Sequence, residues 1–569
     1  MIARRGAPQF PASTGPDTVR VRIHRWQTPV SLAACAASGL LLSFAFPPLE
    51  WSWLAWVALV PMFVFGPRGP LRERSLGGLV FGLAHGLTLF YWLNEIGFFA
   101  GYLLGAVVGL VPALWYVAVA NFATHSSPTG THWGGESARI LLPAAAWVAL
   151  EWLRSWLFTG LPWGFAANSQ WANSAVLPLC TVTGAYGISF LIVAVNAAVG
   201  RALLHARSAE RRGLVVSVAL LAALLLLVFA LPRLADRWVP SPPPSERSVR
   251  VGVAQGNIPQ ARGRADEVFP VALSVYDRLS RSIVEQESPD LLLWPETAVP
   301  ASLRFNEEYA KTVRRLCQET ETPLLIGSTD YRFPEAPAQA SAPEDAPDPV
   351  GFNSAFLIGP NGVILDHQDK THLVPFGEYT PFERWLPFLT DWIGMGTSLQ
   401  PGLEFNLFRL PGDILAGVNI CYEDCFPHIS REFTKRGAEV LLTMTNDAWY
   451  AESAGSRQHL IHAVFRAVEN RRPLLRSGNN SDSCLILADG TITGLLYDEA
   501  SGNRFIRAAK AYEVRAPAVL PLTFYTRFGD VFAGLCVAVS LLSLLPSGIR
   551  ALQRKRRLFT AIRGVDPGG

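Results

Sequence analysis

Charged residues are scarce in this chain of 569 residues. Asp, Glu, Lys and Arg make up 17% of it, below the roughly 25% of ordinary soluble domains, while apolar residues make up 50%. The formal net charge of +3 is too small to indicate a nucleic-acid partner. The apolar excess lies in the first 235 residues and again near 532–545. The composition therefore predicts a membrane protein with a soluble domain at about 248–517.

The seven cysteines contain no pair at Cys-x-x-Cys spacing, which argues against a zinc site or a redox pair. Cys421 and Cys425 are four residues apart, but no His or second Cys pair lies at ligand spacing from them. We therefore predict no metal site. Three other cysteines fall in apolar runs, where a small buried side chain is the simplest interpretation.

Long apolar runs predict membrane helices, because about 20 apolar residues are needed to cross the hydrocarbon core. The clearest run covers 213–231, and no small-residue cleavage site follows the first run, as a signal peptide would require. We predict eight spans, at approximately 28–46, 52–66, 76–94, 99–122, 138–157, 177–200, 213–232 and 528–547.

The distribution of positive charge predicts the orientation. Arg and Lys residues cluster at 4–25, 68–74, 201–212 and 550–556, whereas the loops after the first and third spans contain neither. Positively charged loops stay in the cytoplasm. Both termini are therefore predicted to be cytoplasmic, and the soluble domain to lie on the opposite side, which in a bacterium is the periplasmic side of the inner membrane.

These features divide the chain into six predicted parts. They are a cytoplasmic segment (1–27), a seven-span membrane domain (28–232), a Pro-rich linker (233–248), a catalytic domain (249–517), the eighth span (528–547) and a cytoplasmic tail (548–569). The stretch 335–349, rich in Ala, Pro and acidic residues, is predicted to be a surface insertion.

Within the soluble domain, short apolar strands alternate with helical patterns, which indicates an α/β sandwich layered by helices. A Pro-Asn-Gly turn between 355–358 and 362–365 predicts a hairpin, and 271–287 is predicted to be helical. The other predicted strands are 249–254, 290–294, 324–328, 414–420 and 440–444.

Three chemically active side chains directly follow predicted strands: Glu296, Lys370 and Cys421. Strand ends in α/β folds are where catalytic groups collect. Each has a simpler explanation when taken alone, because a Glu can cap a helix, a Lys is usually solvated and a Cys at a strand end is usually a core residue. The longer motifs around all three favour a joint site.

Those motifs resemble the apolipoprotein N-acyltransferase family, the membrane-anchored branch of the nitrilase superfamily. The resemblance covers essentially the whole chain and includes Glu151-Trp-Leu-Arg-Ser-Trp-Leu-Phe-Thr-Gly-Leu-Pro-Trp163 in the apolar part. In the soluble part it rests on Leu293-Trp-Pro-Glu-Thr-Ala298, Lys370-Thr-His-Leu-Val-Pro-Phe-Gly-Glu-Tyr379, Asn419-Ile-Cys-Tyr-Glu423, Thr445-Asn-Asp-Ala-Trp449 and Arg472-Pro-Leu-Leu-Arg-Ser477.

The resemblance implies a nitrilase-like αββα sandwich and a two-step acyl transfer without a cofactor. A phospholipid gives an acyl chain to a Cys thioester, and the α-amine of a diacylglyceryl-cysteine at the N-terminus of an apolipoprotein then takes it. Glu296 is the implied general base, Lys370 the electrostatic partner and Cys421 the nucleophile. A thiolate is favoured by a neighbouring ammonium group.

Four further residues match family positions. Glu378 is predicted to orient Lys370, Tyr422 to line the thioester site, and Glu423 to be functional rather than a surface carboxylate. For Trp449 a core position and a place at the lip of an acyl-chain pocket are equally open. The chain departs from the family pattern at 261–266, where a Trp is missing, and at 479–484.

Two other functions remain as alternatives at this point. A membrane-tethered amidase would use the same three residues to hydrolyse C–N bonds, because the fate of the thioester depends on whether water or an amine reaches it. A lipid- or lipoprotein-binding protein without activity is the other alternative. The membrane anchor favours lipid substrates, and nothing requires more than a monomer.

Overall fold

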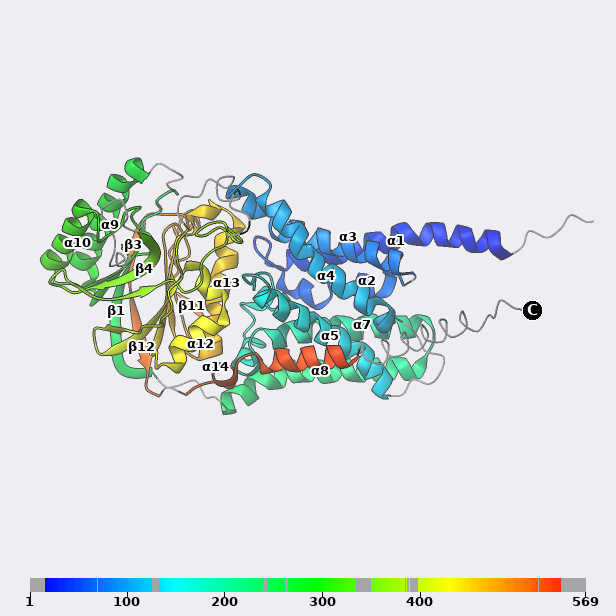
Figure 1. The fold of residues 1–569 in the computed structure, drawn as a ribbon. Coiled ribbons are helices and arrows are strands. Elements are labelled where there is room, and N and C mark those ends of the chain that lie inside the picture. The colour runs from blue at the N-terminus through cyan, green and yellow to red at the C-terminus, as the bar shows by residue number, and fades with distance from the viewer. Residues whose placement is uncertain are drawn as a thin grey trace, which may run out of the picture.

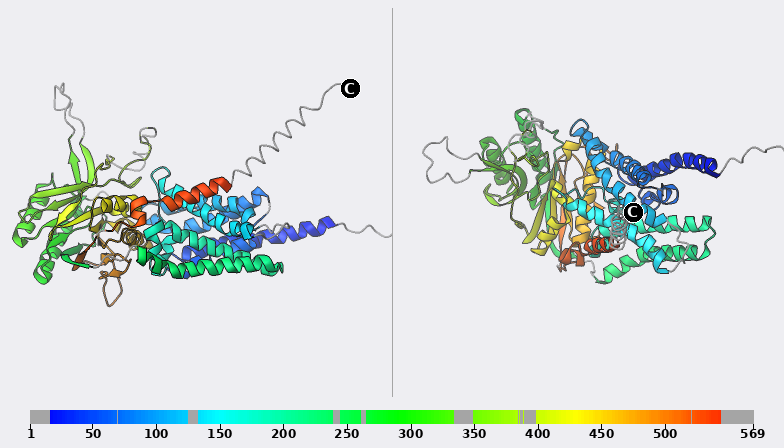
Figure 2. Two further views of the ribbon diagram at one scale, coloured as in Figure 1. Left: turned by 90° about the horizontal axis from the view of Figure 1, so that it is seen from below. Right: turned by 45° about the vertical axis from the view of Figure 1, so that its right-hand side comes forward.

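The structure, a computed structural model, describes residues 16–68, 70–124, 133–238, 244–260, 265–333, 349–383, 385, 388, 398–519 and 521–543. A layered α/β sandwich occupies one end of an elongated molecule, and a bundle of helices occupies the other (Figures 1 and 2). The predicted insertion at 335–349 lies outside the described residues apart from 349, and so do 261–264 of the first departure.

The helical end is built from residues 16–238 together with the helix after 530. Its helices are α1 (Pro16–Phe44), α2 (Val60–Phe65), α3 (Leu71–Leu89), α4 (Ala100–Thr124), α5 (Trp133–Trp156), α6 (Cys180–Thr183), α7 (Tyr186–Arg207) and α8 (Arg211–Trp238). Among the residues that the structure describes, three helical stretches are long and apolar enough to cross a membrane, namely Ala100–Ala120, Tyr186–Arg207 and Arg211–Ala230. Shorter apolar helices cover Pro29–Phe44, Ser52–Phe65 and Val531–Ser543. The count of eight spans therefore stays a prediction.

The sixth expected span differs from the structure in its limits. Residues 177–200 were expected to form one helix, but the long helix α7 begins only at Tyr186 and continues to Arg207. Gly184 ends the short helix α6 with a left-handed φ of 62°, so the chain turns before the long helix starts.

Each sheet of the sandwich has six strands, in the orders β12-β1-β2-β3-β4-β5 and β11-β10-β9-β8-β7-β6. The first comprises β12 (Ala508–Pro517), β1 (Pro244–Gln255), β2 (Leu291–Leu293), β3 (Leu324–Arg332), β4 (Val350–Ile358) and β5 (Ile364–Asp369). The second comprises β11 (Ile492–Thr493), β10 (Cys484–Ile486), β9 (Leu474–Gly478), β8 (Val440–Thr445), β7 (Ile414–Ile420) and β6 (Phe408–Leu410). The predicted strands and the β4–β5 hairpin are confirmed, and the middle of the predicted linker, 239–243, lies outside the described residues.

Alternation along the strands separates two apolar faces of the first sheet. In β1, Val251 and Val253 point into a core shared with Val418 and Leu442 of the second sheet. Ala254 lies in a different core, against α9 (Ala265–Glu287) and α10 (Glu307–Thr320). Because side chains alternate along a strand, one sheet can pack on both faces.

The outer face of the second sheet packs toward the helical end. Two helices cover it, α12 (Pro427–Lys435) and α13 (Ala454–Asn470), and α14 (Phe524–Phe528) follows the last strand (Figure 1). Leu441 and Leu474 of this sheet belong to the same apolar core as residues of α1, α3 and α7. The order of layers is therefore helices α9 and α10, first sheet, second sheet, helices α12 and α13, and then the helical bundle.

One side chain of α13 is bonded to three segments of the bundle. Gln458 Oε1 accepts from Nε1 of Trp92 at 3.1 Å and from Nε1 of Trp163 at 2.9 Å. Its Nε2 donates to the carbonyls of Pro47 at 3.2 Å and Leu89 at 3.3 Å. The bonds to this buried amide fix α13, and with it the second sheet, on the helical bundle.

Helices α3 and α4 pack through glycines. An added Cβ at Gly82 would lie 1.9 Å from the carbonyl oxygen of Gly109, and one at Gly86 would lie 2.0 Å from that of Gly105. Small residues four apart allow two helix backbones to approach this closely in a membrane.

Gly82→Ala should therefore lower the thermal stability of the purified protein in detergent, since one methyl group forces the two backbones apart at a cost of about 1–3 kcal/mol. Gly134→Ala is the matched control, because nothing lies within 4 Å of a Cβ at that helical position. It should leave the midpoint unchanged or raise it. Equal midpoints for the two variants would show that the contact between α3 and α4 is not close.

Candidate active site

Glu296, Lys370 and Cys421 each follow the carboxyl end of a strand. Glu296 comes three residues after β2, Lys370 directly follows β5, and Cys421 directly follows β7. The first two strands belong to one sheet and β7 to the other, so the three side chains approach one another from both sheets. Strand ends facing the same side of a sandwich explain why residues so distant in sequence meet.

The ammonium group of Lys370 lies between two carboxylates. Its Nζ is 3.0 Å from Oε1 of Glu296 and 2.9 Å from Oε2 of Glu378, and the residue is 1% exposed. Burial lowers the pKa of Lys370, but Glu296 and Glu378 outweigh it and hold that pKa well above its ordinary value. Lys370 is therefore an ammonium ion at physiological pH.

Asn353 of β4 connects the same two carboxylates. Its Nδ2 donates to Oε1 of Glu296 at 2.8 Å and to Oε1 of Glu378 at 2.7 Å. The other oxygen of Glu296, Oε2, accepts from the backbone N–H of Asn446 at 3.1 Å, and Oε2 of Glu378 accepts from that of Val374 at 2.7 Å. Both carboxylates are thus held by donors from several segments, which fixes their orientation toward Lys370.

Cys421 opens the short helix η6 (Cys421–Cys425) with a left-handed φ of 53°, an uncommon conformation for a residue with a side chain. Strained backbone of this kind collects at functional sites. The Oγ1 of Thr445 lies 3.3 Å from its Sγ. Burial, followed by the charge of Glu296, raises the pKa of the Cys421 thiol well above its ordinary value, while Lys370 and His459 act in the opposite direction. Cys421 is therefore a thiol in the resting enzyme, and a reaction at its sulfur needs a base.

Glu423 joins the segment after Lys370 to the strand that ends at Cys421. Its Oε1 accepts from N and Oγ1 of Thr371 at 2.6 and 2.7 Å and from N of His372 at 3.2 Å. Its Oε2 accepts from N of Ile420 at 2.7 Å. Burial raises the pKa of Glu423 above its ordinary value, and the bonds to Ile420 and Thr371 act in the opposite direction.

Tyr422 lies between the site and the helical bundle. Its Oη donates to the carbonyl of Gly160 at 3.4 Å, and its ring stacks on that of Trp163 with centroids 6.5 Å apart. One wall of the site therefore comes from the segment that follows α5. Trp449 is 38% exposed, which excludes the fully buried core position considered from the sequence.

Several residues of the site were not singled out from the sequence. Asn353, Thr445, Asp447 and His459 all lie within it. Thr445 and Asp447 belong to the motif Thr445–Trp449, so the sequence could have indicated them as site residues. Asn353 lies inside a strand and His459 inside a helix, and no local sequence signal marks either of them.

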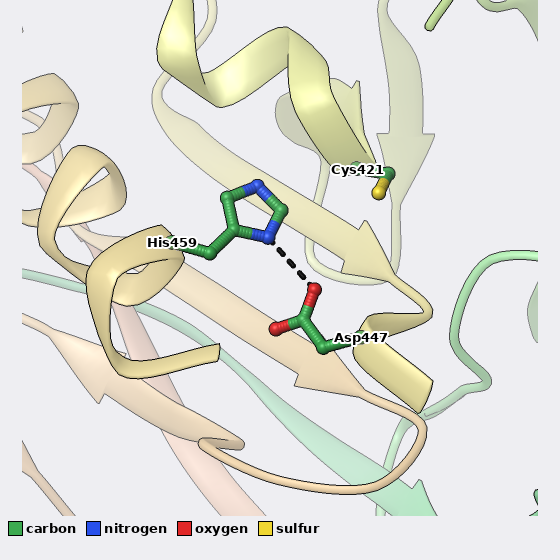
Figure 3. A group of neighbouring side chains, drawn as sticks. All are labelled: Cys421, Asp447 and His459. Carbon is green, nitrogen blue, oxygen red and sulfur yellow. Dashed lines mark hydrogen bonds and ion pairs between the residues drawn. The ribbon is translucent and has the colours of Figure 1, made fainter. Parts of the chain in front are cut away.

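His459, Asp447 and Cys421 also have the composition of a metal site, which the spacing along the sequence did not suggest (Figure 3). Their possible ligand atoms lie within 4.8 Å of one another. His459 Nδ1 is already 2.7 Å from Oδ1 of Asp447, and Nη2 of Arg476 is 2.6 Å from Oδ2 of the same carboxylate. A guanidinium ion thus supplies the positive charge that a metal would bring, and we do not assign these residues as metal ligands.

Comparisons with known proteins place both halves of the chain. The family model described as "Apolipoprotein N-acyltransferase N-terminal domain" matches residues 38–198, and the model "Carbon-nitrogen hydrolase" matches residues 250–504. Among solved structures, a mutant amidase of Nesterenkonia AN1 from the nitrilase superfamily has 17% identity and a TM-score of 0.35, covering 51% of this chain and 99% of its own.

Relatives that match along most of the chain have higher sequence identity than this amidase. Apolipoprotein N-acyltransferase of Geobacter metallireducens is 33% identical over 510 residues, which cover 88% of this chain and 92% of that protein. The protein of the same name from Allorhizobium ampelinum is 32% identical, over 82% of this chain and 87% of its own length. The chain therefore belongs to the apolipoprotein N-acyltransferase family.

Proposed function

We propose that this protein transfers an acyl chain from a phospholipid, through a thioester on Cys421, to the N-terminal amine of diacylated apolipoproteins. The observation that carries the proposal is the buried Lys370 ammonium held between Glu296 and Glu378 beside a strand-end cysteine. The names of the relatives support the choice of substrates. The helical bundle at Tyr422 supports lipid rather than water-soluble substrates, since it contributes a wall of the site.

In the first step, Glu296 accepts the thiol proton of Cys421 as Sγ attacks the ester carbonyl carbon of the phospholipid. The C–O bond to the lysophospholipid then breaks, and the leaving oxygen takes the proton from Glu296. Glu296 is suited to this role because its Oε2 receives one backbone N–H while Lys370 and Asn353 bond Oε1, which leaves lone pairs for a proton.

In the second step, the α-ammonium of the apolipoprotein gives a proton to Glu296 and the resulting amine attacks the thioester. The C–S bond breaks, Cys421 takes the second proton that the attacking nitrogen loses, and Glu296 releases the first proton to solvent, which restores the starting state. Both steps pass through a tetrahedral oxyanion. We propose that Lys370 and the backbone N–H of Tyr422 stabilise its negative charge. One such donor typically lowers the barrier by about 3–4 kcal/mol.

We propose the membrane topology and the oligomeric state from the sequence. Eight spans, cytoplasmic termini and a catalytic domain on the periplasmic side of the inner membrane follow from the clusters of Arg and Lys at the ends of apolar runs. The protein acts as a monomer in this proposal, because Glu296, Lys370 and Cys421 come from one chain.

Cys421→Ala should abolish acyl transfer while the protein remains folded. Purified protein is incubated with a phospholipid labelled in the acyl chain and a diacylated lipopeptide, and mass spectrometry follows the label on the protein and on the peptide. The parent protein should carry the acyl group on Cys421 and pass it to the peptide amine. Cys317→Ala is the control, because this buried cysteine lies on α10.

The same assay separates the alternative amidase-type function, which the match to the carbon-nitrogen hydrolase model favours. Label in free fatty acid, with none in the peptide, would assign the protein as a hydrolase. An adduct on Cys425 would move the nucleophile, and no adduct together with normal transfer would contradict the thioester.

Glu423→Gln should slow thioester formation about tenfold to a hundredfold, because the amide group turns an NH₂ donor toward backbone donors and the segments carrying Lys370 and Cys421 lose their common anchor. Formation of the acyl adduct after rapid mixing measures it. Glu513→Gln, at an exposed position of β12, is the control. A rate equal to that of the parent would reduce Glu423 to a dispensable contact.

The proposed orientation is tested with a membrane-impermeant maleimide on spheroplasts. Arg515→Cys, at an exposed position of the catalytic domain, is introduced into the Cys421→Ala variant and should be labelled, while Cys421→Ala alone, whose remaining six cysteines are buried, should not. Labelling only after the spheroplasts are lysed would place the domain in the cytoplasm.

A further inference from the structure

Behind Cys421 lies a closed ring of four charged side chains. His459 of α13 pairs with two carboxylates: Nδ1 is hydrogen-bonded to Oδ1 of Asp447 at 2.7 Å, and Nε2 forms an ion pair with Oδ1 of Asp424 at 3.0 Å. Arg476 of β9 closes the ring, with Nη1 at 3.1 Å from Oδ2 of Asp424 and Nη2 at 2.6 Å from Oδ2 of Asp447. All four side chains have no exposed surface. We refer to these residues as the ion ring.

The geometry sets the protonation of His459. Both of its ring nitrogens face carboxylate oxygens, so each must carry a proton to make a bond rather than a repulsion. The ion ring then contains two negative and two positive charges and is neutral. Burial lowers the pKa of His459, but Asp424 and Asp447 outweigh it and hold that pKa well above its ordinary value.

The remaining titratable groups around His459 do not change this balance. They are Cys421, Tyr422 and Cys425 of η6, Tyr450 of η7 and His462 of α13. The pKa values of these thiols and phenols are raised, mainly by burial, and that of His462 is lowered by burial, so all five are neutral at physiological pH.

The ion ring reaches the nucleophile through one hydroxyl group. Oγ1 of Thr445 is 2.9 Å from Oδ1 of Asp447 and 3.3 Å from Sγ of Cys421. The hydroxyl has a single proton, for which the Asp447 carboxylate and a Cys421 thiolate compete. His459 and Arg476 neutralise the charge of Asp447, which makes its carboxylate a weaker acceptor for the Thr445 hydroxyl group. An ion ring without the charge of His459 would instead place one net negative charge beside the sulfur.

We propose that His459 is a positioning residue for Cys421: as an imidazolium ion it keeps the ion ring neutral, so that the Thr445 hydroxyl can stabilise the thiolate. The consequence for acyl transfer rests on the proposed function. The effect on the reactivity of the sulfur does not, because it concerns only the charges around Cys421.

The test measures the alkylation rate of Cys421 by iodoacetamide from pH 6 to pH 9.5. It uses the purified full-length protein in detergent, with site-resolved mass spectrometry. His459→Gln removes the imidazolium charge and leaves an amide that can still donate to one carboxylate. Alkylation at a given pH should be about tenfold slower or more, because a net buried charge near the sulfur shifts its titration by about one to two pH units.

Two further variants distinguish charge from shape. His459→Gln combined with Asp424→Asn restores a neutral ring without touching Thr445, and alkylation should return to within about threefold of the parent. His462→Gln makes the same replacement at a neutral histidine one turn along α13 and should leave the pH profile unchanged. A parental rate for His459→Gln, or a double variant as slow as the single one, would overturn the proposal.

Folding is checked by size-exclusion chromatography and thermal unfolding. A single variant that fails to fold beside a folded double variant agrees with an uncompensated buried charge. Failure of both, with His462→Gln folded, would show that His459 is required for its shape and would reject the charge role. The assay contains no lipid or lipopeptide, so absence of acyl transfer in the parent would reject the proposed function without changing this result.

Discussion

A fully buried ammonium ion is the constraint on which the candidate site depends. An unpaired charge at the position of Lys370 would be strongly unfavourable, so the fold has to bring it acceptors. Glu296 and Glu378 supply them from a strand end and from the loop after β5, and Asn353 connects the two carboxylates from a neighbouring strand. The requirement to satisfy one charge thus orders three separate segments, and the proposed base, Glu296, and its proposed electrostatic partner, Lys370, become fixed relative to each other before any substrate binds.

The helix α13 extends this order to the helical bundle. Two adjacent residues of this helix point to different parts of the molecule: Gln458 accepts hydrogen bonds from the indoles of Trp92 and Trp163, and His459 forms ion pairs with the carboxylates behind Cys421. Trp163 also stacks on Tyr422, next to the nucleophile. One helix therefore holds both the ion ring and the wall of the site that comes from the bundle, which couples the position of the sulfur to the position of that wall.

The sequence predicted local elements better than long-range contacts. β1, β3, β7 and the β4–β5 hairpin were accessible because apolar runs and a Pro-Asn-Gly turn are local signals. The nine-residue difference at the start of α7 arose because a left-handed glycine, Gly184, ends the preceding turn, and an apolar run alone does not reveal that break. Glu296 and Lys370 were expected at strand ends that meet, and the structure brings them within 3.0 Å.

The residues that were missed share a physical reason. Asn353 and His459 stand in the middle of regular elements, where a polar residue normally faces solvent, and their partners are far away in the chain. No periodicity or spacing connects His459 with Asp424. Their importance appears only when burial is known, because a buried charge must find an opposite charge while an exposed one need not. Trp449 is partly exposed, and the sequence could not show this because the exposure depends on neighbours that the local motif does not specify.

The charges on the two sides of Cys421 explain how one thiol can be both stable and reactive. Burial, followed by the charge of Glu296 on one side, raises the pKa of the Cys421 thiol and keeps the resting sulfur protonated, while Lys370 on the same side acts in the opposite direction. A carboxylate can accept the thiol proton only in its negatively charged form, so a carboxylate base beside the thiol necessarily disfavours the thiolate. A second negative charge, on the side of the ion ring, would disfavour the thiolate further without helping the proton transfer. The neutral ion ring avoids it. In the proposed mechanism, transfer of the thiol proton to Glu296 moves the negative charge from the carboxylate to the sulfur, where Lys370 and the Thr445 hydroxyl group are already in place.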